Sequence, residues 1–213
     1  KKIPLPTAVI LGNHDRGNDR SGELLKKQIA ILGDIHCAWG FRNWQYPKIG
    51  VVGARPCSSG GGFSLSEAVV SAFGPISLNR SVERIVAAAK EVPEDWPLVL
   101  LAHVGPVGLG SEANSLCGRD WKLPSLDWGD HDLGLAIDQI RKNRIPDIVV
   151  FGHMHHSLYR GGGVRNTFYK DIWGTVYLNT ACVPRRGFDD TDTEICHFSW
   201  IEFLGQKLVF EYS

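Results

Sequence analysis

The sequence predicts an α/β sandwich with a mixed β-sheet, and three observations support this fold class. Short apolar runs alternate with segments of helical periodicity through most of the chain. The C-terminal part then becomes a succession of strand-like segments. Strands that alternate with helices and are followed by paired strands are typical of such a sandwich. Because we find no internal repeat and no linker, we expect a single domain over residues 1–213.

The strands are predicted from apolar runs that are too short to be helices. Runs of this kind, bounded by loop-forming residues, are usual for strands that are covered on both faces. Four of them precede the C-terminal part, at residues 8–11, 49–53, 97–102 and 147–151. Further strands are expected near the C-terminus, at residues 166–170, 175–179, 198–203 and 207–212.

Helices are expected where apolar side chains recur at helical spacing. Residues 23–32 read ELLKKQIAIL and are followed by Gly33, which favours a helix end at that point. The other expected helices span residues 66–73, 81–92 and 133–142. Residues 105–130 are rich in Gly, Pro, Ser and Trp and are predicted to form a long loop, which inside a compact domain is usually functional.

The composition is that of an ordinary globular protein. Of 213 residues, 43% are apolar and 22% are charged, and the 23 basic residues equal the 23 acidic ones. This balance gives no indication of a nucleic-acid partner, and no apolar run approaches the roughly 18 residues of a membrane span. The five cysteines form no CxxC pair, which favours free thiols in a reducing compartment. We therefore expect a soluble, intracellular protein.

Polar side chains follow three of the predicted strands. In open α/β sheets, ligands lie beyond the carboxyl ends of the strands, so these side chains are expected to meet at one edge of the sheet. Imidazole nitrogens and amide oxygens suit zinc, iron and manganese. The residues are Asn13, His14 and Asp15 after residues 8–11, His103 after residues 97–102, and His153 and His155 after residues 147–151.

The motifs GNHD, a lone histidine after a strand, and GHMH, in this order, resemble the last three of five motifs in the calcineurin-like metallophosphoesterases. The stretches VVGARP, LAHVGPVGLG, CGRDW and VVFGHMHH resemble a branch of that family found in cyanobacteria and plants. The resemblance covers nearly the whole chain. It implies a hydrolase that acts on phosphate mono- or diesters, and the plant relatives make a plastid one expected location.

The resemblance also implies roles for individual residues. Asn13, His103 and His153 would bind one divalent metal ion, and His155 would bind a second; manganese, iron and zinc all suit these ligands. His14 would contact the phosphate and act as a general acid, oriented by Asp15. The substrate would be a small phosphate ester attacked by a metal-activated hydroxide.

The family's first two motifs, D-x-H and GD-x-x-D, do not precede Gly12 in this chain. The second aspartate of the latter motif bridges the two metals in the family. We therefore expect weak binding of the second metal and impaired hydrolysis by this chain, in contrast to a full-length protein that carries both motifs. A non-catalytic interaction module and a mononuclear hydrolase that uses Asn13, His103 and His153 remain the alternatives.

Several other polar or aromatic residues have two interpretations. Arg55 and Arg119 could clamp a phosphate with two parallel hydrogen bonds, or could be surface arginines. Asp34 and His36 spell the D-x-H motif but follow GNHD, so we expect them to lie away from the site. The remaining residues are expected to be structural or solvated: His131, His156 and His197, Asp120, Asp130 and Asp132, and Trp121 and Trp128 as loop anchors.

Overall fold

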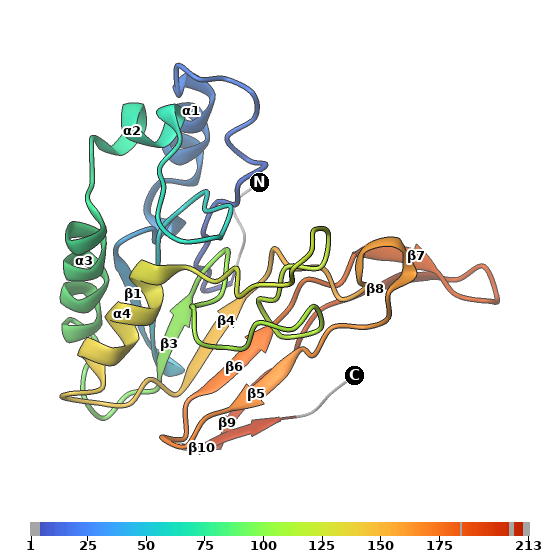
Figure 1. Cartoon of the computed structure of the whole chain (residues 1–213). Coiled ribbons are helices and arrows are strands. Elements are labelled where there is room, and N and C mark those ends of the chain that lie inside the picture. The colour runs from blue at the N-terminus through green and yellow to red at the C-terminus, as the bar shows by residue number, and fades with distance from the viewer. Residues whose placement is uncertain (1–4, 184, 205–206, 211–213) are drawn as a thin grey trace.

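A computed structural model describes residues 5–183, 185–204 and 207–210, and its centre is a six-stranded sheet (Figure 1). The strands are β1 (Phe41–Gln45), β2 (Lys48–Gly53), β3 (Leu98–Leu101), β4 (Ile148–Phe151), β5 (Phe168–Lys170) and β6 (Val176–Asn179). Their spatial order is β1-β2-β3-β4-β6-β5. The four inner strands are parallel, while β1 and β5 are antiparallel edges, so the sheet is mixed as predicted.

The described residues form four α-helices: α1 (Glu23–Leu32) before the first strand, α2 (Glu67–Phe73) and α3 (Leu78–Lys90) between β2 and β3, and α4 (His131–Ile140) between β3 and β4. Two of them begin at serine caps, since the hydroxyl of Ser66 accepts the Val69 N–H and that of Ser77 accepts the Arg80 N–H. Short 3-10 turns occupy Gly33–Ile35 and Tyr159–Gly161. Figure 1 shows α3 and α4 side by side next to the sheet.

Alternation along the inner strands sorts their side chains between two apolar layers. On β3, Leu98 and Leu100 pack in the core with the helices, whereas Val99 faces the other side of the sheet. There it packs with Ile201 and Phe203 of β9 (Ile201–Leu204), which pairs with β10 (Lys207–Phe210). The sheet is thus covered on both faces, which is the sandwich that the sequence predicts.

The structure departs from the predicted elements at several places. Residues 8–11 form only an isolated bridge, between Val9 and His36, because the chain turns away at Gly12. Helix α3 begins at Leu78 rather than residue 81, since Ser77 supplies the cap. Residues 211–212 of the last predicted strand lie outside the described residues. Three strands whose residues are mostly polar or exposed were not predicted from the sequence: β1, β7 (Arg186–Phe188) and β8 (Glu194–Cys196).

The long loop after β3 is attached to the core by a buried charge cluster. Arg55 is only 2% exposed and its guanidinium contacts Asp130 Oδ1 at 2.6 Å and Asp132 Oδ2 at 3.3 Å. Burial raises the pKa of Asp130, the positive charge of Arg55 opposes that rise, and Asp132 adds to it. The expectation of solvated or capping aspartates is therefore wrong for these two, which share one guanidinium inside the protein.

We predict that Arg55→Met destabilises the fold by about 3 kcal/mol or more, because it leaves two buried carboxylates without their shared cation. The matched control is Arg80→Met, which removes an arginine that is 61% exposed and pairs with Glu83 on α3. That change should lower the free energy of unfolding by less than about 0.5 kcal/mol. Urea unfolding of both variants measures the difference, and equal losses would contradict the role assigned to the buried cluster.

Candidate metal centre

The pairing of β3 with β4 brings two histidines to the same edge of the sheet. Leu101 lies opposite Val150, and the Gly152 N–H donates to the His103 carbonyl at 3.0 Å just beyond the strand ends. His103 and His153 therefore leave adjacent strands side by side. His153 has a φ of 69°, an uncommon conformation for a residue with a side chain and one that is concentrated at functional sites.

A turn at residues 12–15 supplies the third donor. The Cys57 N–H donates to the Leu11 carbonyl at 2.8 Å, which fixes the start of this turn beside the loop after β2. At Gly12 the His103 ring approaches so closely that a Cβ would lie 2.6 Å from His103 Cε1. Only glycine allows this contact, and the contact places Asn13 against the imidazole.

Three donor atoms converge at this point. Asn13 Oδ1 lies 2.8 Å from His103 Nε2, and His153 Nδ1 lies 3.2 Å from the same nitrogen. Separations of about 3 Å match those between neighbouring ligand atoms of one ion with bonds of about 2.0–2.1 Å. These residues therefore fit one divalent cation. In the part of the chain that the structure describes, no three His, Cys, Asp or Glu side chains form such a group, and this cluster instead combines two imidazoles with one amide oxygen.

The electrostatics keep both histidines neutral. Burial lowers the pKa of His103 to about 3, with smaller contributions from His153 and His14. Burial also lowers the pKa of His153 to about 4, again helped by neighbouring His155 and His14. A neutral imidazole keeps a free lone pair, which is the form that binds a metal ion. Both imidazoles are therefore neutral near pH 7, as a metal ligand would have to be.

The donors open into a cavity of about 600 Å³. Its lining includes all the predicted metal ligands and His14, and both His14 and His155 are exposed. The carboxylate of Asp15 accepts the Gly12 N–H at 2.6 Å. Asp15 therefore stabilises the turn that carries His14. The family resemblance implies instead that Asp15 orients the His14 ring directly.

The structure does not bring the two predicted phosphate-binding arginines to this cavity. Arg55 lies in the buried charge cluster, and Arg119 is 8% exposed, with its guanidinium 5.0 Å from the centre of the Trp128 ring. Neither is a surface arginine and neither lines the cavity. The cationic side chains that do line it are Arg165 and Arg185, which the sequence analysis missed because no motif surrounds them.

Arg165 links the histidine segment to the long loop. Its Nε donates to the His155 carbonyl at 3.0 Å, and its Nη1 donates to the carbonyls of Ser115 and Gly118, each at 2.7 Å. Its Nη2 lies 3.4 Å from Asp120 Oδ2. Asp120 is thus another half-buried, ion-paired residue rather than a solvated one, and it lines the same cavity.

His156, His131 and the D-x-H sequence at residues 34–36 lie outside this cavity. Asp34 and His36 sit at the 3-10 turn after α1, and neither lines the cavity. The His156 ring contacts the Asn179 carbonyl at 3.1 Å, a structural role. His131 begins α4 and lines a second cavity of about 640 Å³ between α4 and the β5–β6 segment.

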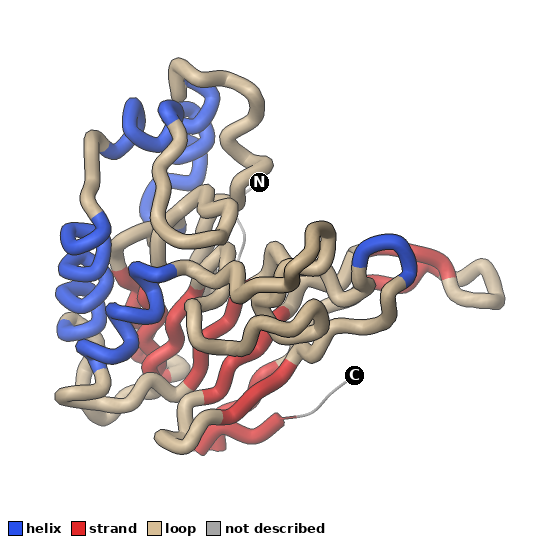
Figure 2. Tube along the Cα trace, in the orientation of Figure 1, coloured by secondary structure: helices blue, strands red, loops and turns tan. Residues whose placement is uncertain are grey.

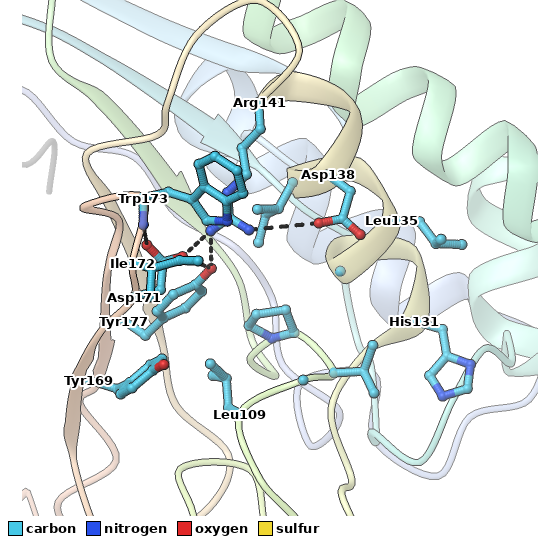
Figure 3. A pocket seen from close by; sticks show the side chains of 15 residues that line it. Leu109, His131, Leu135, Asp138, Arg141, Tyr169, Asp171, Ile172, Trp173 and Tyr177 are labelled. Carbon is cyan, nitrogen blue, oxygen red and sulfur yellow. Dashed lines mark hydrogen bonds and ion pairs between the residues drawn. The ribbon is translucent and has the colours of Figure 1, made fainter.

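This second cavity is of similar size but holds none of the predicted site residues (Figure 3). Figure 3 shows Tyr169, Trp173 and Tyr177 opposite side chains of α4. At one end of this cavity Arg141 forms an ion pair with Asp171 and donates to the Tyr177 hydroxyl. The charges of Arg141 and Asp171 are therefore already paired with each other. Figure 2 shows loops at the carboxyl edge of the sheet, where the first cavity lies.

The chain matches no family model and no curated protein. A solved structure similar to it is that of TT1561 of Thermus thermophilus, with 14% sequence identity and a TM-score of 0.46. The match covers 90% of this chain and 71% of that one. No helix among the described residues is long and apolar enough to cross a membrane.

We predict that the metal-free protein loses stability as the pH falls from about 6.5 to about 4. Unfolded histidines titrate near 6.5, whereas His103 and His153 titrate at about 3 and about 4 when folded. The unfolded chain thus binds protons that the folded chain does not. The free energy of unfolding therefore falls by at most about 1.4 kcal/mol per pH unit for each imidazole. His103→Gln should reduce this slope in urea unfolding at several pH values; an unchanged slope would contradict the assignment.

We also predict that Gly12→Ala displaces the His103 ring, because the new methyl group would overlap it. The matched control is Gly152→Ala, where the nearest side-chain atom, the Ala181 Cβ, is at an ordinary 3.8 Å. Crystal structures of the two variants should show the contact between Asn13 and His103 broken in the first and kept in the second. A His103 ring that stays in place in Gly12→Ala would refute the close approach.

Proposed function

We propose that this protein is a metal-dependent hydrolase of phosphate mono- or diesters, of the calcineurin-like metallophosphoesterase type. The convergence of Asn13 Oδ1, His103 Nε2 and His153 Nδ1 at a strand-end cavity carries this proposal. All three come from the segments whose sequence resembles that family. The cyanobacterial and plant branch stays a prediction from the sequence resemblance, and the chemistry of these donors does not depend on it.

A divalent ion held by these three residues would supply positive charge to the phosphoryl oxygens and activate water. His155 extends from the same segment at the cavity surface and is the available protein ligand for a second ion. Because a single imidazole is a weak ligand, we propose that this chain binds one ion tightly. Manganese, iron and zinc each suit two imidazoles and an amide oxygen.

The protein's own side chains would bind the ester and move protons. His14 lies exposed at the cavity and can donate a proton to the leaving oxygen. The exposed guanidinium of Arg185 lies in the same lining and can pair with a phosphate oxygen. The Asp15 bond to the Gly12 N–H fixes the turn on which His14 and Asn13 sit. The proposed hydrolysis therefore depends on the turn at residues 12–15 and on the ends of β3 and β4.

A non-catalytic interaction module is the second candidate. The observation that favours it is the absence, within the described ranges, of any three His, Cys, Asp or Glu side chains grouped to hold a metal. Metal binding separates the two functions, because a binding module has no need for a stoichiometric ion at this cluster. The mononuclear hydrolase is distinguished from a dinuclear one by the number of ions bound.

We predict that the purified chain binds one manganese ion and that His153→Ala weakens this binding at least about 100-fold, since it removes a direct ligand. Calorimetry measures affinity and stoichiometry, and hydrolysis of p-nitrophenyl phosphate should fall in parallel. His131→Ala is the matched control, because His131 is exposed and lines the other cavity. Wild-type protein that binds no metal would overturn the proposal and favour the interaction module.

A further inference from the structure

The cavity that holds the candidate metal ligands is also lined by aromatic residues. Trp121, Trp128 and Tyr159 all contribute to its lining. Trp121 is 44% exposed and Tyr159 is 52% exposed, so both present apolar surface to the cavity. The sequence analysis treated the two tryptophans as loop anchors, and the structure separates their roles.

Trp128 is the anchor. Its indole N–H donates to the Ser59 carbonyl at 2.9 Å, and the Arg119 guanidinium lies 5.0 Å from its ring centre. A Cβ on Gly60 or Gly61 would lie 2.5–2.6 Å from ring atoms of this indole. Two consecutive glycines therefore make room for the ring, and hydrogen bonding fixes its position.

Trp121 rests on this fixed ring. The two indoles are perpendicular, with centroids 5.4 Å apart and an interplanar angle of 81°. This edge-to-face geometry is favourable, and it restrains Trp121 without burying it. An aromatic side chain that is held in place yet almost half exposed in a cavity is suited to receive another ring at little entropic cost.

The aromatic residues are also tied to the candidate metal ligands. The Asp120 carboxylate, next to Trp121 in sequence, accepts the Tyr159 N–H at 2.7 Å. The same carboxylate pairs with Arg165, whose Nε donates to the His155 carbonyl. Trp121, Tyr159 and the histidine segment are therefore connected through one buried guanidinium. These contacts join the backbone segments that carry Trp121 and Tyr159 to the segment that carries His153 and His155.

We propose that the substrate is a phosphate ester whose organic group is a planar aromatic ring, bound against Trp121 and Tyr159 while its phosphate lies at the histidines. This inference rests on the proposed phosphoesterase function and adds the class of substrate. A cavity of about 600 Å³ has the size of pockets that hold whole organic ligands, so it accommodates more than a phosphate group. Aryl and nucleoside phosphates share the required chemistry.

The test compares phenylphosphonate with cyclohexylphosphonate, which have the same head group and rings of similar size but different planarity. Calorimetry in the presence of manganese should show wild-type protein binding phenylphosphonate about fivefold to tenfold more tightly. Trp121→Ala should abolish this preference, and Trp121→Phe should retain most of it. The Phe variant and circular dichroism show that any loss does not come from unfolding.

The matched control is Trp173→Ala, which removes an exposed tryptophan (57%) from the other cavity. It should keep the full preference for the aromatic ligand. Equal binding of the two phosphonates by wild-type protein, retained preference in Trp121→Ala, or lost preference in Trp173→Ala would each overturn the inference.

The same protein samples distinguish this inference from the function on which it rests. A preference for phenylphosphonate that needs Trp121, without hydrolysis of p-nitrophenyl phosphate, would leave an aromatic binding site and remove the proposed enzyme. Hydrolysis of aryl and alkyl phosphates at equal kcat/KM, with no phosphonate preference, would keep the enzyme and remove the aromatic substrate class.

Discussion

The parallel pairing of β3 with β4 is the constraint on which the candidate site depends. Leu101 is opposite Val150, and this register places His103 and His153 two residues beyond the ends of neighbouring strands. The register is set by the core, because Leu98 and Leu100 face the helices while Val99 faces β9. A shift by one residue would reverse every one of these side chains. Apolar packing therefore sets the strand ends from which the two histidines extend.

Buried arginines fix the loops that complete the site. Arg55 holds the end of the long loop through Asp130 and Asp132, and also donates to the Gly62 carbonyl at 2.9 Å. Arg165 holds the middle of that loop through backbone carbonyls and Asp120. A loop without regular structure leaves many carbonyls unpaired, and a guanidinium with five N–H donors satisfies several at once. The two arginines thus give the cavity walls a fixed shape.

Local patterns in the sequence were enough to predict the inner strands, most helices and the meeting of the polar strand ends. They could not predict interactions across long sequence separations. Arg55 and Asp130 are 75 residues apart, so no periodicity relates them. Strand β1 has the polar sequence FRNWQ and lies half-exposed at an edge, where apolar alternation is weak. Residues 8–11 have the composition of a strand, but they pair through one bridge only.

The two cavities differ in the conformation and the pairing of the residues around them. Around the cavity at the histidines, burial keeps the imidazoles neutral and His153 adopts a left-handed backbone conformation. The close approach of the His103 ring requires a glycine at Gly12. The left-handed backbone of His153 costs free energy, and strain of this kind is concentrated at functional sites. In the cavity between α4 and the β5–β6 segment, the charged groups Arg141 and Asp171 pair with each other. In the cavity at the histidines, by contrast, the Asn13 amide oxygen and the nitrogens of His103 and His153 pair with one another, and these are the donor atoms that the proposed metal ion would take up.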